Sequence, residues 1–260
     1  MNTHELCCVG HITLDKVVTP KNTVHMPGGT SFYFSHAIKH FDDIDYTLVT
    51  ALAESEMKTV EELRAEGIDV AVMPSKHTVY FENIYDDFSL EVVKYLAGKG
   101  LVSIDSQGYL REVRDKDVFA VDWPEKKEVL KYVHFLKANE HEMEVLTGYT
   151  DAVNAGKVIY DWGVKEVLLT FGSMGSIIYD GSTFHKIPAY IPKEVVNATG
   201  AGDTYMTGYL YKRAKGASIE EAGRFAAAMT TLKIEGIGPF NGTKEDVLRC
   251  LETAEQRMPE

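Results

Sequence analysis

The stretch that most constrains this chain runs from Val195 to Met206, where two β-branched residues lead into a small-residue turn and then into a helical pattern. The turn, Gly200–Gly202, leaves the backbone open to close approach. The first N–H groups of a helix have no partner within it, and the helix dipole adds positive charge there, so this end suits phosphate. Asp203 lies in the same turn, where a carboxylate could accept a proton from an attacking hydroxyl. The alternative is a plain helix start capped by Thr199 or Asp203.

Length and composition narrow the class of protein. The chain has 260 residues, enough for one large α/β domain or two small ones, and 45% of them are apolar. Its net charge of −12 argues against a nucleic-acid partner and an anionic membrane surface. The longest apolar runs are too short for a membrane span, and no signal peptide is visible, so we expect a cytoplasmic protein. The adjacent Cys7 and Cys8 fit neither a disulfide framework nor a zinc pair and are expected in a buried strand.

Strand-like and helix-like segments alternate along the chain. This alternation predicts an α/β fold with a mostly parallel central sheet and helices on both faces. A half-exposed strand at 11–18 is followed by a polar connection at 19–26. Further strands are predicted at 6–10, 46–52, 68–73, 101–104, 118–122, 133–137, 167–170, 176–179 and 184–187, and helices at 54–66, 88–96, 219–234 and 244–251, with others beginning near 30, 124, 139 and 200.

Two candidate ligand positions follow the first strand. Asp15 lies just beyond its carboxyl end, at the edge where open α/β sheets bind ligands, although it could be a plain turn or edge aspartate. Gly28 and Gly29 open a helix and would let a ligand touch the backbone. The alternative is an ordinary turn capped by Thr30 or Ser31.

Polar residues also follow the later strands. Asn139 and Glu142 have the spacing of a capping box, and they could equally lie near a phosphate-bound Mg²⁺, which often keeps waters between itself and a carboxylate. Thr170, Gly172 and Gly175 form a TxGxxG pattern at a strand end, which alone is weak evidence for a nucleotide site.

The chain contains one further pair of charged candidate residues and lacks several known catalytic motifs. Asp105 and Arg111 could form a substrate-site pair or only organise a loop. HExxH, GxSxG and Walker patterns are missing from the sequence, as is GxGxxG after the first strand, which argues against zinc enzymes, serine hydrolases and dinucleotide oxidoreductases.

Five ordered motifs together resemble the PfkB (ribokinase-like) sugar kinases over nearly the whole chain. They are Gly10-x4-Asp15, Gly28-Gly29, Asn139-x-x-Glu142, Thr170-x-Gly172-x-x-Gly175 and Asn197-Ala-Thr-Gly-Ala-Gly-Asp203. The segment 105–111 is similar to a branch that includes inositol-type kinases. The resemblance implies transfer of phosphate from ATP, with Mg²⁺, to a hydroxyl of a sugar or sugar-like polyol.

The resemblance also implies a role for each motif. Asp203 would be the catalytic base, and the turn before it would be the anion hole for the transferring phosphoryl group. The implied site residues are Asp203, Gly200, Ala201 and Gly202 for catalysis, Asp15, Gly28, Gly29 and Tyr33 for the substrate, Asn139, Thr170, Gly172 and Gly175 for the nucleotide, and Glu142 for Mg²⁺.

Three features depart from the family pattern. Asn197 stands where many relatives carry an aspartate linked to a monovalent-cation site, which leaves potassium activation open. Tyr33 stands where sugar and nucleoside kinases commonly place an asparagine. The chain is also short between Tyr85 and Asp86, where relatives fit further strands.

We therefore predict a single ribokinase-like domain over residues 1–260, with a small β lid from about 11–26 and 77–85. Lid sheets in this family often pair between subunits, so a homodimer is a hypothesis. A nucleoside kinase is the nearest alternative, because Tyr33 and Phe81 could stack on a base. A ligand-binding sensor with little catalysis is the other alternative, suggested by Asn197 and the short lid.

Overall fold

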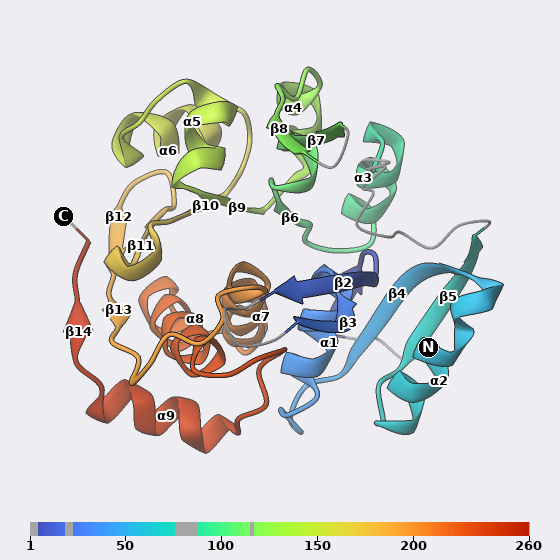
Figure 1. The fold of residues 1–260 in the computed structure, drawn as a ribbon. Coiled ribbons are helices and arrows are strands. Elements are labelled where there is room, and N and C mark those ends of the chain that lie inside the picture. The colour runs from blue at the N-terminus through green and yellow to red at the C-terminus, as the bar shows by residue number, and fades with distance from the viewer. Residues whose placement is uncertain (1–4, 19–22, 76–87, 115–116, 260) are drawn as a thin grey trace. The chain divides into compact units, whose positions relative to one another are not determined.

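The chain divides into two compact units, each with its own sheet and its own buried core (Figure 1). The structure is a computed structural model that describes residues 5–18, 23–75, 88–114 and 117–259. Unit 1 comprises residues 1–82 and 190–255, and unit 2 comprises residues 83–189 and 256–260. The single domain expected over residues 1–260 stays a prediction.

Unit 1 is built on a parallel sheet with the strand order β1-β4-β5. The strands are β1 (Leu6–Val9), β4 (Tyr46–Ala53) and β5 (Val70–Ser75), and helix α2 (Met57–Ala65) with the 3-10 turn η1 (Glu54–Glu56) joins the last two. Cys8 is half-buried, with its Sγ 4.0 Å from Ser31 Oγ of helix α1 (Thr30–Ile38). Cys7 is exposed because neighbouring side chains of a strand point to opposite faces, so the expected burial of both cysteines is wrong.

A second feature of unit 1 is an antiparallel hairpin of β2 (Thr13–Val18) and β3 (Thr23–Gly28). Its register places Asp15 opposite Met26 and Thr13 opposite Gly28. The polar connection expected at 19–26 is therefore wrong in its second half, which forms a strand. The hairpin occupies the first predicted lid segment, whereas the second, 77–85, lies outside the described residues.

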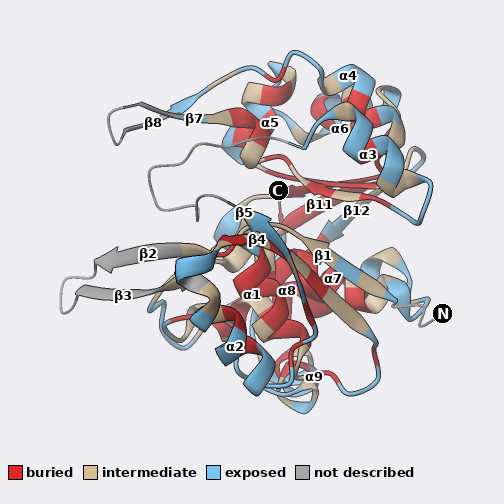
Figure 2. Cartoon of the chain, turned by 90° about the vertical axis from the view of Figure 1, so that its right-hand side faces the viewer, coloured by how far each residue is buried: buried red, intermediate tan, exposed pale blue. Residues whose placement is uncertain are grey.

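Helices of the C-terminal half complete unit 1. They are α7 (Ala201–Ala214), α8 (Ile219–Ile234) and α9 (Lys244–Thr253), and α7 packs along both α8 and α1. Figure 2 shows that much of α1, α7 and α8 is buried. Tyr209 of α7 and Phe225 of α8 are fully buried. A capping box between Ser218 and Glu221 starts α8, because each side chain accepts the other residue's backbone N–H.

Unit 2 contains a mixed sheet with the order β12-β11-β10-β9-β6. Strands β6 (Ser103–Asp105), β9 (Phe135–Asn139) and β10 (Glu166–Thr170) run parallel, while β11 (Ser176–Tyr179) and β12 (Phe184–Ile187) add an antiparallel hairpin. Leu136, Leu168 and Ile178 are fully buried in adjacent strands. Continuous apolar runs thus give strands covered on both faces.

The remaining elements of unit 2 surround this sheet. The helices are α3 (Leu90–Ala97), α4 (Lys126–Val129), α5 (Glu140–Thr147) and α6 (Ala152–Asp161), and the 3-10 turns are η2 (Gly108–Leu110), η3 (Leu130–Tyr132) and η4 (Gly172–Met174). Strands β7 (Arg111–Arg114) and β8 (Asp117–Ala120) form an antiparallel pair. The two-residue strand β14 (Gln256–Arg257) belongs to unit 2, whereas β13 (Ala189–Tyr190) lies at the boundary between the units. The sequence reasoning missed α6, although Asp151 is a plain N-cap whose carboxylate accepts from Asn154 N–H.

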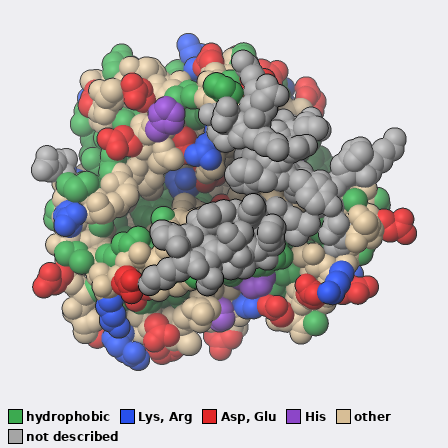
Figure 3. All heavy atoms as spheres, in the orientation of Figure 1, with side chains coloured by type: hydrophobic (Ala, Val, Ile, Leu, Met, Phe, Trp, Pro, Cys, Tyr) green, Lys and Arg blue, Asp and Glu red, His purple; other side chains and the backbone are tan. Residues whose placement is uncertain are grey.

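On the face drawn in Figure 3, acidic, basic and neutral side chains of the described residues are mixed. None of the helices in the described ranges has the length and apolar character that a membrane crossing requires.

Candidate active site

The glycine turn of unit 1 is an open helix start. Gly200 occupies the N-cap position of α7 in the left-handed region, with φ 77°. Because the N-cap of α7 is Gly200, which has no side chain, the alternative of an N-cap at Thr199 or Asp203 is wrong. A Cβ at position 200 would lie 2.2 Å from the Tyr33 ring. Glycine is therefore required twice, by the backbone conformation and by the ring.

The loop before the turn is tied to the end of α8. The backbone N–H groups of Val196 and Asn197 donate to Ile234 O at 2.8 and 3.2 Å. Asn197 Oδ1 accepts from Thr199 N–H at 2.7 Å, which closes a local turn. Its backbone carbonyl accepts a hydrogen bond from Lys233 Nζ at 2.9 Å. Asn197 thus joins the turn to a buried lysine that sequence reasoning did not single out.

Asp203 lies in the first turn of α7 and is partly exposed. Its carboxylate is close enough to act on two neighbours. Burial raises the pKa of the Cys8 thiol to about 12, with a hydrogen bond to Ser31 opposing and the Asp203 charge adding to the rise. Burial lowers the pKa of Lys233 to about 8, and Asp203 opposes this by attraction. The carboxylate therefore stands near one ammonium and one protonated thiol.

The second glycine turn of unit 1 has the same open form. Gly29, which has no side chain, is the N-cap of α1 with φ 84°, so the alternative of an N-cap at Thr30 or Ser31 is also wrong. A Cβ at position 29 would lie 2.5 Å from His11 O. Tyr33, four residues into α1, is 3% exposed and packs under Gly200.

Unit 2 gathers polar side chains at the carboxyl ends of its parallel strands. The register places Asp105 opposite Lys137 and Asn139 opposite Thr170. Lys137 is 3% exposed, and its Nζ lies 2.8 Å from Asp105 Oδ2. Parallel strands bring their carboxyl ends to one edge, which explains this gathering. A lysine within the apolar run Phe135–Asn139 was the signal that could have found this ion pair.

Glu142 is buried beside Arg111 at the same edge. Asn139 and Glu142 form the capping box of α5, and the Asn139 N–H donates to Glu142 Oε2 at 2.8 Å. Glu142 Oε1 lies 3.6 Å from Arg111 Nη2 and makes no hydrogen bond within the described part of the chain. Burial raises the pKa of this carboxyl, whereas Lys137 and Arg111 act in the opposite direction. Asp105 thus forms its ion pair with Lys137 and Arg111 with Glu142, while a shared role of Asp105 and Arg111 at a substrate site stays a prediction.

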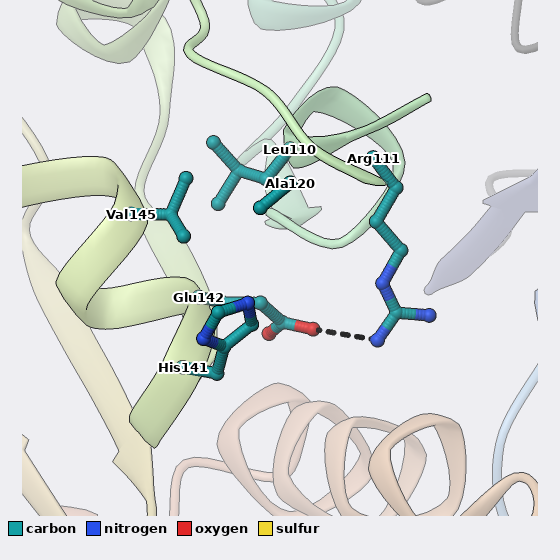
Figure 4. Close-up of a pocket in the computed structure, with 6 residues that line it drawn as sticks. All are labelled: Leu110, Arg111, Ala120, His141, Glu142 and Val145. Atoms are coloured by element: carbon teal, nitrogen blue, oxygen red, sulfur yellow. Dashed lines mark ion pairs between the residues drawn. The ribbon is translucent and has the colours of Figure 1, made fainter. Parts of the chain in front are cut away.

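A cavity of about 320 Å³ opens over this pair within unit 2. Figure 4 shows Glu142 and Arg111 pointing toward each other from α5 and from the start of β7. The wall is completed by four further residues, Leu110, Ala120, His141 and Val145.

The TxGxxG pattern forms the strand end and turn that its sequence suggested. Thr170 ends β10, and Gly172 opens η4 with φ 53° and no atom within 4 Å of a built Cβ. Gly175 has φ 94°, and a Cβ there would lie 2.3 Å from Ile187 O. Gly172 therefore leaves space above the backbone, whereas Gly175 allows close packing of the hairpin.

The structure thus assembles two groups of predicted residues, each within one unit. Tyr33 and Gly200 meet in unit 1, and Asn139, Glu142 and Thr170 meet in unit 2. The side chain of Asp15 and all of Phe81 lie outside what the structure describes.

A magnesium ion fits the unit 2 group on one observation. Glu142 keeps one buried oxygen without a hydrogen bond, and carboxylate oxygens are ligands that Mg²⁺ prefers. Within the described ranges, three His, Cys, Asp or Glu side chains nowhere come together as a metal site. Mg²⁺ commonly uses one or two carboxylates with water and substrate phosphates, so a single carboxylate is compatible with it.

Comparison with known proteins places this fold. The chain superposes on a pyrophosphate-dependent kinase of the ribokinase family, complexed with a pyrophosphate analog and myo-inositol, with a TM-score of 0.81, 24% identity, and coverage of 94% of this chain and 99% of that one. It superposes on Arabidopsis thaliana ribokinase, complexed with ribose and ATP, with a TM-score of 0.72, 20% identity, and coverage of 96% and 99%. At these identities the likeness establishes the fold, which is the predicted ribokinase-like α/β fold.

Sequence comparison gives the family. The chain is 26% identical to the cytidine kinase of Thermococcus kodakarensis over 85% of this chain and 92% of that protein. It is 27% identical to a nucleoside kinase of Methanocaldococcus jannaschii, over 76% of this chain but only 60% of that protein. The model of the pfkB family of carbohydrate kinases matches residues 91–245. The chain belongs to this family and is a kinase, that is, a phosphotransferase.

Proposed function

We propose that this kinase transfers a phosphoryl group from ATP to a hydroxyl of a sugar or sugar-like polyol. The observation that carries the proposal is the turn before α7, where Gly200, which has no side chain, is the N-cap of the helix and Asp203 stands in the first helical turn. Backbone N–H groups fixed in this way stabilise charge that develops on a phosphoryl group. Membership of the pfkB family supports the same reading.

The residues of the turn would have two roles, proton acceptance and binding of the phosphoryl oxygens. Asp203 accepts the proton of the substrate hydroxyl, and the hydroxyl oxygen forms a bond to the γ-phosphorus of ATP. The bond from that phosphorus to the bridging oxygen breaks, and ADP leaves with the electron pair. The N–H groups of Gly200, Ala201 and Gly202 bind the phosphoryl oxygens during transfer.

The other predicted residues would bind the two substrates. Asp15, Gly28 and Gly29 are proposed to bind the acceptor, and Thr170, Gly172, Gly175 and Asn139 the nucleotide. Glu142 would hold Mg²⁺, and the ion would neutralise charge on the donor phosphates. Tyr33 is 3% exposed, so we propose that it supports Gly200 and affects the acceptor through that turn.

A panel of donors and acceptors tests this assignment. The wild-type protein is incubated with ATP or pyrophosphate and with sugars, inositols or nucleosides, and the phosphorylated product is measured by mass spectrometry. We expect product with ATP, Mg²⁺ and a sugar or polyol. Loss of a general base typically lowers the rate by about 10²–10⁴-fold, so Asp203→Asn should do so. Asp42→Asn, at an exposed aspartate of unit 1, is the matched control.

Two other outcomes have support from relatives. Product with a nucleoside would favour the nucleoside-kinase reading, which the 26% identity to a cytidine kinase supports. Product with pyrophosphate in place of ATP would match the donor of the structural relative that binds a pyrophosphate analog. Thermal stabilisation by an acceptor without any product would identify a ligand-binding sensor and refute the kinase mechanism.

The lid remains part of this proposal. We propose that the hairpin β2–β3 and the segment 77–85 cover the acceptor and exclude water from it. Pairing of such lids would give a homodimer, and sedimentation that shows only monomer at micromolar concentration would rule this out.

A further inference from the structure

Lys233 is an unusual side chain in unit 1. It lies in the last turn of α8 and is 2% exposed, and among the described residues of this unit it is the only charged side chain that is buried. A buried ammonium is costly, and an apolar side chain of similar volume would avoid that cost. The contacts of the Lys233 ammonium should therefore explain why a charge is buried here.

The hydrogen bond and the ring contact of Lys233 both lie beside the turn before α7. Lys233 Nζ donates to the Asn197 carbonyl at 2.9 Å and stands 5.7 Å from the centre of the Tyr33 ring. The same ring packs against Gly200. The ammonium thus touches the carbonyl that precedes the turn and the ring that supports it. Figure 1 shows α7 and α8 as neighbouring helices, and they pack along each other.

The neutral side chain of Asn197 matters for the charge at this place. Its amide oxygen accepts from Thr199 N–H, so it fixes the turn without adding a negative charge beside Lys233. The positive charge of Lys233 is then left to act on Asp203 and on an anion bound at the start of α7. It has the same sign as the helix N-terminus and adds to its field.

We propose that Lys233 is a positioning residue of the phosphoryl-transfer site: its buried ammonium fixes the Asn197–Gly200 turn through the Asn197 carbonyl and supplies a built-in cation behind the N-terminus of α7. This inference rests on the proposed function. It predicts that activity depends on the charge of a side chain that touches neither substrate.

The pH dependence of activity follows from the groups around the ammonium. Burial lowers the pKa of Lys233 to about 8, and Asp203 on α7 is the charged group that opposes this. Tyr33 on α1 lies under the ammonium, and Cys8 on β1, near Asp203, stays protonated because its pKa is raised to about 12. The wild-type kcat should therefore fall as the pH rises through about 8, because Lys233 loses its proton.

Three substitutions at position 233 separate the effect of the charge from that of the side-chain volume. Lys233→Met keeps the volume without the charge, Lys233→Arg keeps a charge that persists above pH 12, and Lys233→Ala leaves room for an added cation. Lys212→Met is the matched control, because Lys212 on α7 also stands over an aromatic ring, 5.5 Å from the centre of Phe225, away from the turn. Circular dichroism verifies that each variant is folded, and kcat and KM are measured from pH 6 to 10.

We expect Lys233→Met to lower kcat at pH 7 at least tenfold with little change in acceptor KM, and Lys212→Met to leave both unchanged. Lys233→Arg should retain activity and lose the alkaline fall near pH 8. Methylammonium chloride should partly restore Lys233→Ala, whereas tetramethylammonium chloride at the same ionic strength should not.

The inference is overturned if Lys233→Met keeps kcat within twofold of wild type, or if the alkaline fall is unchanged in Lys233→Arg. The arginine variant decides the matter even if Lys233→Met fails to fold. Failure of the proposed function looks different, since the wild type would then make no product or Asp203→Asn would remain active.

Discussion

Replacing Gly200 by alanine isolates how much the turn depends on glycine. Gly200 has φ 77°, and a Cβ there would lie 2.2 Å from the Tyr33 ring. The left-handed conformation costs a residue with a Cβ about 1–2 kcal/mol, and forcing an extra carbon into a packed site costs about 1–3 kcal/mol more. Gly200→Ala should therefore lower the free energy of unfolding by about 2–5 kcal/mol.

The other end of α7 provides a matched control. Gly216 has φ 79°, but no atom lies within 4 Å of a Cβ built there. Gly216→Ala should thus cost only the conformational part, about 1–2 kcal/mol. Urea unfolding followed by circular dichroism measures both variants. The difference between them is the cost of the contact with the Tyr33 ring.

A double-mutant cycle checks the cause. In a Tyr33→Ala background the ring is gone, so Gly200→Ala should cost no more than Gly216→Ala does. The coupling energy should be about 1–3 kcal/mol, as for residues in direct contact. In the wild-type background, Gly200→Ala should also lower kcat by about 10²-fold, because displacing a positioning turn by about 1 Å has that effect. Equal losses for the two glycine variants, or additive effects with Tyr33→Ala, would refute the reasoning.

Three further predictions concern charge and capping. The pKa of Lys233 falls from its ordinary 10.5 to about 8, so the wild type buries a charge at pH 7 but not at pH 10.5. At about 1.4 kcal/mol per pKa unit, the stability of Lys233→Met relative to wild type should decline by about 3 kcal/mol between these pH values. A pH-independent difference in urea midpoints would contradict this prediction. Burial raises the pKa of Glu142 above 4.5, so Glu142→Gln should be more stable than wild type at pH 7. This gain in stability should vanish well below pH 4.5, where the carboxyl is protonated in the folded and the unfolded protein. Thermal unfolding of both proteins at neutral and acidic pH measures the difference. Ser218→Ala removes the capping box of α8 and should cost about 1 kcal/mol, whereas the exposed Ser173→Ala should change stability little.

The local sequence was sufficient for several elements that short-range chemistry decides. The capping box of Asn139 and Glu142, the hairpin after Ser176–Tyr179 and the long helix Ile219–Ile234 follow from spacing and turn residues within a few positions. The helix Ala152–Asp161 is not among the predicted elements, although Asp151 marks its start as an N-cap.

The ion pairs show what local sequence does not contain. Asp105 and Arg111 are six residues apart and of opposite charge, yet Asp105 pairs with Lys137 and Arg111 with Glu142. The parallel register of β6 and β9 brings residues 32 positions apart into contact, and it outweighs proximity along the chain. Asp105 therefore pairs with the lysine that the strand register places beside it.

The stretch Asn197–Asp203 shows both contributions. Its sequence by itself determined a glycine-rich helix start with one carboxylate, because small residues and the helix terminus act locally. Only the tertiary structure decided that Tyr33 fills the space a Cβ at position 200 would need, and that Lys233 holds the loop from α8. The physical reason is that burial of a ring and of an ammonium depends on packing between helices distant in sequence, which no local pattern encodes.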